Sequence, residues 1–221
     1  MCVNMEIPKG WEIVKLGEVC QIAYGKGLPT KQLKDKGNPV FGANGVIGFN
    51  DKYLYEFPQV LISCRGAYSG KINFSPPKCF VTNNSLILQL IDESSLSKRF
   101  LFYVLQTANQ SELVTGTAQP QVTINNAVEL IFPFPPLPEQ CRIVDKIETL
   151  FSSLDKGIES LKTSQQQLKV YRQAVLKWAF EGKLTNDNVK DGELPDGWKW
   201  VKLGDLAEKI QIGPFGSQLH K

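Results

Sequence analysis

A seven-residue apolar repeat in the second half of the chain is the feature that most constrains its fold. From Glu139 to Phe180 there is no proline and only one glycine, Gly157. Within this stretch, apolar residues recur at every seventh position, namely Ile147, Leu154, Leu161, Leu168 and Val175. This spacing, with charged flanks, is typical of a coiled-coil seam. At about 1.5 Å per residue, the stretch predicts a helix roughly 60 Å long.

A helix of this kind cannot bury its own apolar stripe. It needs a second helix, either from a second repeat of the same chain or from another chain. We expect the helix to span residues 139–183. The preceding PFPPLP (133–138) should exclude helix up to its own end, and Gly182 is suited to end a helix. The sequence contains one such helix, so we predict a coiled coil with another chain in a homodimer.

An internal repeat divides the chain. Residues 7–20 recur at 194–207 without a gap, and similarity of this density indicates a repeated structural unit. Seven positions are identical, namely Pro8/Pro195, Gly10/Gly197, Trp11/Trp198, Val14/Val201, Lys15/Lys202, Leu16/Leu203 and Gly17/Gly204. We therefore expect one full unit and the first 28 residues of a second. The predicted organisation is a domain over 1–138, the helix over 139–183, and a linker with the start of a second domain over 184–221.

The first 134 residues predict an α+β domain. Short apolar runs broken by turn residues indicate strands, namely PVFGANGVIGF, QVLISC, NSLILQLI and ELIFPF. A helix is expected over about 94–110, where Leu101, Val104, Leu105 and Ala108 share one face. The expected architecture is thus one mixed α/β domain with a loop-rich surface, followed by the long helix.

Composition excludes several classes of protein. No run approaches the 18 apolar residues of a transmembrane helix, and the N-terminus has no secretory pattern, so we expect a cytoplasmic protein with no membrane partner. The five cysteines are widely spaced and never form CxxC, which argues against a disulfide framework and a zinc site. The single histidine, His220, leaves little basis for histidine-centred metal or triad chemistry.

Tests for catalytic motifs fail. RGAYSGKI (65–72) lacks the spacing and the following hydroxyl residue of a phosphate-binding loop. The Glu-x-Lys at 181–183 has no partner carboxylate of the kind that a nuclease needs, and no glycine-rich cofactor loop follows a clear strand. The sequence therefore favours binding over catalysis, and we expect neither a metal nor a cofactor to be bound by this chain.

The candidate DNA contacts are basic and polar loop residues. The net charge of +3 is small, so a nucleic-acid surface has to be local. The candidates are Lys26, Lys31, Lys34, Lys36, Arg65, Lys71, Thr117, Gln119, Gln121 and Thr123. Glutamine can pair with adenine and arginine with guanine through two hydrogen bonds, while lysines hold phosphates. The alternative is that the lysines form an ordinary solvated loop and that the polar residues belong to an ordinary turn.

Taken together, these segments resemble the specificity subunits of type I restriction-modification enzymes. The resemblance spans essentially the whole chain, from IPKGWEIVKLGEV through GTAQPQVT and PFPPLPEQCRIVDKIETLF to AVLKWAFEGKLT. It implies that the domain is a target-recognition domain for double-stranded DNA. It also implies that the long helix is a spacer that forms an antiparallel coiled coil with a second such helix. It also implies modification (methyltransferase) and restriction (translocase-nuclease) subunits as partners. S-adenosylmethionine, ATP and Mg would serve those partner subunits.

The missing second half indicates a half-length or truncated form of such a subunit. The leading hypothesis is a non-catalytic specificity subunit that directs the partner subunits to a split DNA site. The alternatives are an inactive truncation or recombination-cassette product, a restriction-methylation polypeptide cut short, and a free-standing coiled-coil DNA-binding protein.

Overall fold

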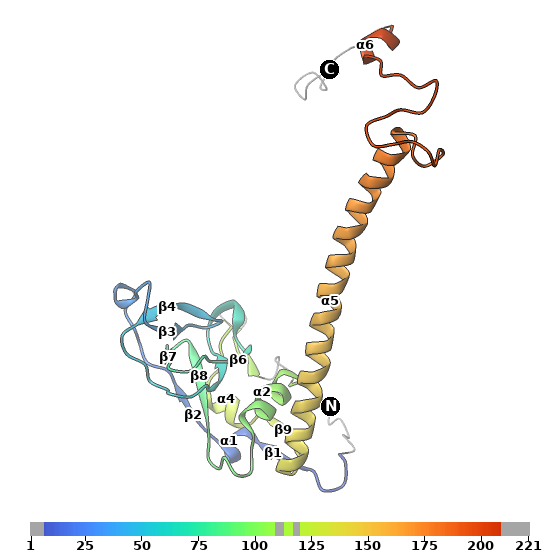
Figure 1. Ribbon diagram of the computed structural model, residues 1–221. Coiled ribbons are helices and arrows are strands. Elements are labelled where there is room, and N and C mark those ends of the chain that lie inside the picture. Colours follow the sequence, from blue (N-terminus) through green and yellow to red (C-terminus); the bar gives the residue numbers. More distant parts are fainter. Residues whose placement is uncertain (1–6, 109–112, 117–119, 209–221) are drawn as a thin grey trace, which may run out of the picture. The chain divides into compact units, whose positions relative to one another are not determined.

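The computed structural model describes residues 7–108, 113–116 and 120–208 (Figure 1). Its contacts divide the chain into two compact units, Met1–Ser152 and Ser153–Lys221. The long helix α5, Leu137–Phe180, passes through this division. The α+β fold class and the long helix that the sequence predicts are both confirmed.

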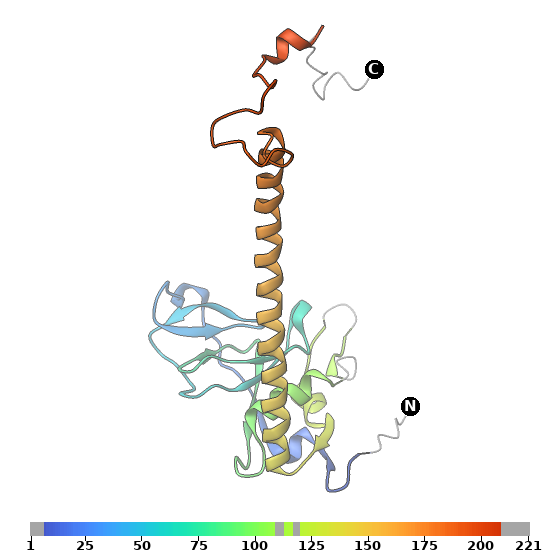
Figure 2. The same ribbon diagram turned by 45° about the vertical axis from the view of Figure 1, so that its right-hand side comes forward.

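The described residues of the first unit form three sheets, which are antiparallel or mixed. The strands are β1 (Glu12–Lys15), β2 (Cys20–Tyr24), β3 (Asn38–Phe41), β4 (Val46–Asn50), β5 (Val60–Ser63), β6 (Ile72–Phe74), β7 (Phe80–Val81), β8 (Ser85–Leu90) and β9 (Ile131–Phe134). Their orders are β2-β8-β5-β6, β4-β3-β7 and β1-β9. Figure 2 shows the first two sheets beside the helical part of this unit. All four apolar runs singled out in the sequence form strands.

Short helices complete the first unit. These are α1 (Leu16–Val19), α2 (Lys98–Gln106), α4 (Ile124–Val128) and the 3-10 turns η1 (Thr30–Gln32) and η2 (Gly66–Tyr68). The predicted helix over 94–110 is shorter in the structure, because the Ser97 hydroxyl accepts the Phe100 N–H and caps α2 at that point. Its predicted apolar face is correct, since Leu101 and Leu105 lie in the core with Val104 and Ala108 against it.

The first turns of α5 belong to the first unit. Gln140 and Val144 are buried there, and Tyr103 of α2 packs edge-on against Phe151 at 6.2 Å. The helix begins two residues before the predicted Glu139, at Leu137, so the expectation that PFPPLP excludes helix up to its own end is wrong. Proline is tolerated in a first turn, where its missing N–H has no helical partner to lose.

Gly182 ends α5, as the sequence predicts. Its φ is +78°, and its N–H donates to the Ala179 carbonyl at 3.1 Å, while the Lys183 N–H donates to the Trp178 carbonyl at 2.9 Å. These two bonds form a Schellman motif, which satisfies the last carbonyls of a helix. The helix therefore ends at Phe180 rather than Lys183.

The second unit contains the rest of α5 and the segment that follows it. Pro195 lies directly against Gly182, because a Cβ added at that glycine would come within 2.1 Å of the proline Cγ. Lys183 also pairs with Glu181 at 3.0 Å and with Asp191 at 2.5 Å. These contacts close residues 182–195 into a loop. One helical turn, α6 (Leu203–Leu206), follows.

Candidate nucleic-acid interface

The structure brings together two loops that lie far apart in the sequence. Arg65 and Gln121 form an antiparallel bridge, although more than fifty residues separate them. Next to them, the Gly66 N–H donates to the Pro120 carbonyl at 3.3 Å, and the Ser69 hydroxyl donates to the same oxygen at 2.7 Å. We call the surface formed by residues 65–71 and 120–121 the bridged-loop surface. It combines predicted basic and polar site residues.

The turn chemistry of residues 63–71 explains why this loop projects its side chains. The backbone folds back on itself, with the Gly70 N–H donating to Ser63 at 2.8 Å and the Ser63 N–H donating to Lys71 at 2.9 Å. Gly66 and Gly70 both have positive φ, +79° and +88°, which favours glycine. Arg65 and the exposed Tyr68 therefore point outward from a fixed turn.

A shallow hollow lies beside this turn. It has a volume of about 320 Å³ and is lined by Ala67, Tyr68, Ser69, Lys71, Ile72 and Gln106. The ammonium of Lys71 lies over the Tyr68 ring, 5.7 Å from its centroid. This contact restrains the lysine without neutralising its charge.

Gln121 is held by its backbone and leaves its side chain exposed. Its N–H donates to the Thr115 carbonyl at 3.0 Å, and its own carbonyl accepts the Thr115 N–H at 2.9 Å. Thr123 has a different position, because its hydroxyl caps α4 by accepting the Asn126 N–H at 3.3 Å. Thr117 and Gln119, two other predicted contacts, lie outside the described residues.

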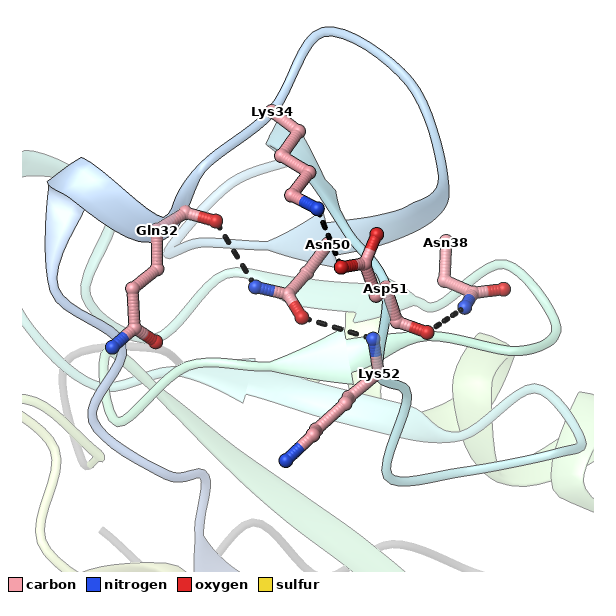
Figure 3. Close-up of polar contacts among 6 residues, drawn as sticks. All are labelled: Gln32, Lys34, Asn38, Asn50, Asp51 and Lys52. Carbon is pink, nitrogen blue, oxygen red and sulfur yellow. Dashed lines mark hydrogen bonds and ion pairs between the residues drawn. The ribbon is translucent and has the colours of Figure 1, made fainter.

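The four lysines of residues 26–36 lie near the second sheet. Lys26 forms a backbone bridge with Thr82, and Lys31 is exposed in η1. The ammonium of Lys34 pairs with Asp51 at 2.5 Å, as Figure 3 shows. In the same view, the Asn50 amide donates to the Gln32 carbonyl at 3.1 Å. These contacts order the loop between η1 and β4.

Most of the predicted basic residues keep an uncompensated charge. Among the described residues, the ion pairs do not include Lys26, Lys31, Lys36, Arg65 or Lys71. All five are exposed. Lys34 differs, because Asp51 already neutralises it.

Sequence reasoning missed a group of asparagines next to Arg65. Cys64, its neighbour, donates its N–H to the Asn84 carbonyl at 2.9 Å, and the Cys64 thiol contacts the Asn83 carbonyl at 3.5 Å. Within the described part of the chain, the Asn83 and Asn84 amides make no side-chain hydrogen bond. Both lie in the turn TNNS before β8. An asparagine pair in a turn is the sequence signal, but it is common in ordinary turns too.

The predicted coiled-coil residues change character along α5. Ile147 and Val175 are half-buried, whereas Leu154, Leu161 and Leu168 are 60%, 72% and 66% exposed. Tyr171 and Trp178, on the companion seam positions, are exposed as well. The apolar stripe therefore has no partner within the described chain.

Three of the described cysteines of the first unit are buried and free, whereas Cys141 is free and exposed. Cys20, Cys64 and Cys79 form no disulfide. Burial raises the pKa of the Cys20 thiol to about 12 and that of Cys79 to about 11. Thiols with such pKa values are poor nucleophiles at neutral pH.

The described residues offer neither a metal-ligand cluster nor a membrane-spanning helix. Within the described ranges, no three His, Cys, Asp or Glu side chains gather as a metal site would require. No described helix has the length and hydropathy to cross a membrane.

These features match a known class of DNA-specificity protein. The family model described as the type I restriction modification DNA specificity domain matches residues 8–169, well over half of the chain. The chain belongs to this family.

Several relatives are known by sequence and structure. The EcoDI specificity subunit of Escherichia coli is 23% identical over 93% of this chain and 51% of its own length. The MjaVIII specificity subunit of Methanocaldococcus jannaschii is 24% identical over 83% and 48%. The HsdS subunit from Thermoanaerobacter tengcongensis superposes with a TM-score of 0.58 at 28% identity, covering 81% and 47%. The chain thus spans about half the length of these relatives.

Proposed function

We propose that this chain recognises a specific sequence in double-stranded DNA as part of a type I restriction-modification system. The observation that carries the proposal is the bridged-loop surface, where Arg65 and Gln121 meet across an antiparallel bridge. Both side chains can read base edges through paired hydrogen bonds. Membership of the specificity family supports DNA as the ligand.

Base reading and phosphate binding are assigned to different parts of the surface. Arg65, Gln121 and the neighbouring Asn83 and Asn84 lie together on short, fixed turns, which suits the geometric demands of base contacts. Lys31 and Lys36 are long, exposed and unpaired, which suits phosphate contacts. Lys34 contributes less, since Asp51 neutralises its charge.

The chemistry of modification and cleavage is assigned to partner subunits. The chain itself would act as a non-catalytic adaptor for modification (methyltransferase) and restriction (translocase-nuclease) subunits, which would use S-adenosylmethionine, ATP and Mg. The free buried cysteines suit the reducing conditions of a cytoplasmic location.

We propose that α5 pairs with α5 of a second copy of the chain. The exposed stripe of Leu154, Leu161 and Leu168 supplies the apolar seam, and a two-fold interface is self-complementary. Such a dimer would present two identical recognition surfaces and read the same half-site twice in inverted orientation. Relatives of twice this length support a two-domain arrangement.

The test compares Arg65→Ala, Lys31→Ala and the double variant Lys34→Ala/Asp51→Ala in the chain assembled with its modification subunits. Bound or methylated DNA is identified by sequencing. Arg65→Ala should relax preference at one base pair by about 1–3 kcal/mol, or roughly 5- to 150-fold. Lys31→Ala should weaken all sequences alike and reduce the salt slope by about 1.

The double variant Lys34→Ala/Asp51→Ala is the matched control, because it removes an ion pair from the same loop without a change in net charge. Its effect on affinity should be smaller than that of Lys31→Ala. An unchanged recognised sequence in Arg65→Ala would refute the assignment of base reading to the bridged-loop surface. Binding of DNA without sequence preference by the assembled wild type would refute the proposed function itself.

A further inference from the structure

The two copies of the internal repeat adopt the same local conformation. In each copy a tryptophan N–H donates to the proline three residues earlier, at 3.1 Å for Trp11 and 3.0 Å for Trp198. The intervening glycines, Gly10 and Gly197, have φ of +87° and +85°. One helical turn follows in each copy, Leu16–Val19 and Leu203–Leu206.

Within the part of the chain that the structure describes, the first copy is docked and the second is not. Its strand β1 pairs with β9, from Glu12 opposite Phe134 to Lys15 opposite Ile131. Leu16 is 0% exposed in the core, whereas its counterpart Leu203 is 74% exposed. Residues 199–202 have no strand partner among the described residues. The second copy therefore has the local shape of a docking segment and, among the described residues, contacts no docking surface.

Four consecutive residues that make contacts in the first copy are identical in the second. Lys15 pairs with Glu129 at 2.6 Å, and Lys202 stands in its place. Gly17 packs so closely on Val128 that an added Cβ would come within 2.8 Å of the valine Cβ. The second copy also has a glycine at this position, Gly204. The matching set is thus retained at Val201, Lys202, Leu203 and Gly204.

The differences between the copies fall mainly where the first copy is exposed. Glu12 and Ile13 are exposed, and they are replaced by Lys199 and Trp200. Two core-facing positions also differ. Leu206 replaces Val19, which packs against the core, and Ala207 replaces Cys20, which is 3% exposed. The smaller alanine leaves part of that space unfilled, so the second copy should fit the same site somewhat less well.

We propose that residues 194–207 dock on a second copy of this chain, along β9 and α4, in the place that its own residues 7–20 occupy. Residues 194–207 of one copy and residues 7–20 of the other then compete for the same site. In the dimer, each copy can bind the other copy's residues 194–207 in place of its own residues 7–20. This inference does not depend on DNA binding. It names a second interaction surface besides the apolar seam of α5.

The length of α5 favours a second copy as the partner. A 44-residue helix is about 66 Å long, and β9 immediately precedes it. The contact of Pro195 with Gly182 anchors the docking segment at the other end of the helix. From Pro195 to Lys202 the chain can extend by at most about 25 Å. An antiparallel helix pair, by contrast, brings this end beside the partner's β9.

Disulfide trapping tests the proposal in the full chain. One chain carries Ile131→Cys, and a second, distinguished by a longer affinity tag, carries Lys202→Cys. Both carry Cys2→Ser and Cys141→Ser, which leave only the buried native cysteines. Opposed residues of an antiparallel pair lie about 4.5–5.5 Å apart between Cα atoms, within the range of a disulfide. A single chain with Lys15→Cys and Ile131→Cys is the positive control for this geometry.

Mixing the two chains should yield a disulfide-linked heterodimer, at least about fivefold more than with Asp196→Cys in place of Lys202→Cys. Asp196 corresponds to Lys9, which lies outside β1, so it is the matched control. Yield no higher than this control overturns the proposal.

Two glycine substitutions test which segment occupies the site. Gly204→Ala in the docking segment should lower the yield severalfold, because its methyl group would meet Val128 of the partner. Gly17→Ala in the Ile131→Cys chain should raise it, because the same clash weakens the resident segment. Gly204→Ala lies outside the first unit and leaves that unit folded. An unchanged yield in Gly204→Ala overturns the proposed register of docking.

Discussion

The side chain of Gln140 fastens the first turns of α5 to the first unit, and its removal should be costly. The residue is 0% exposed. Its amide nitrogen donates to the carbonyls of Ser95 and Pro135, both at 2.9 Å, and its oxygen accepts the Ser97 N–H at 2.9 Å. All three polar groups of the side chain are therefore satisfied by backbone from two other segments.

Gln140→Ala leaves these three backbone groups without their partner. At about 1 kcal/mol or more for each lost buried hydrogen bond, the free energy of unfolding should fall by roughly 3 kcal/mol. For a unit of this size, the melting temperature should fall by roughly 6–12 °C. Urea unfolding followed by circular dichroism measures the change. Gln166→Ala, at an exposed position of the same helix, is the control and should change stability little.

Gln140→Glu adds a pH dependence that separates hydrogen bonding from packing. Its carboxylate would face the Ser95 and Pro135 carbonyls in a buried site, which raises the folded-state pKa above the unfolded value of about 4.3. A carboxyl group with a raised folded pKa costs no stability while protonated in both states. The loss grows above the unfolded pKa, at about 1.4 kcal/mol per pH unit, and levels off above the folded pKa.

The glutamate variant should therefore be more stable than Gln140→Ala near pH 4 and less stable near pH 7. Stability curves for the two variants that run parallel between these pH values would show that the two carbonyls do not face the side chain. A loss below about 0.5 kcal/mol in Gln140→Ala would refute the claim that Gln140 fastens the helix.

Two further predictions concern α5 and α4. Leu161→Glu should weaken the proposed dimer at least about 100-fold in sedimentation equilibrium, because the two copies each lose roughly 1.5–3 kcal/mol of apolar burial. Gln166→Glu, on the opposite face of the heptad, is the control and should leave the mass in solution unchanged. Equal effects of the two substitutions on the dimer would exclude the seam as the interface. Thr123→Ala should lower stability by about 1 kcal/mol through loss of the α4 cap, and Thr123→Ser should restore both stability and recognised sequence. A changed recognised sequence in Thr123→Ser would instead indicate a DNA contact by the threonine methyl group.

Much of the fold could be predicted because its signals are local. The heptad spacing gave the long helix, and Gly182 marked its end, because both depend on residues within one or two turns. The start of the helix was misplaced, since proline excludes helix in the interior but not in the first turn. The length of α2 depends on the Ser97 cap, and serine is too frequent for such a cap to stand out in sequence.

The candidate site was predictable in its residue types but not in its arrangement. Arg65 and Gln121 could each be chosen for their hydrogen-bonding chemistry, yet nothing in the sequence indicates that they bridge. Loop-to-loop pairing over such a separation has no periodicity. The pairing of Lys34 with Asp51 was equally invisible, although it removes one of the four loop lysines from the uncompensated charges.

A comparison of the two copies of the repeat shows which features depend on the local sequence and which depend on packing. Trp11 and Trp198 close the same turn, so that turn needs no tertiary partner. Residues 12–15 form a strand against β9, whereas residues 199–202, with the same valine and lysine, pair with no described strand. Strand formation is therefore a property of the docking surface rather than of the segment. Because the second copy keeps the residues that β9 and α4 contact, pairing should appear as soon as such a surface is supplied. The trapping yield in Gly17→Ala measures that directly, since this variant frees the surface without altering the docking segment.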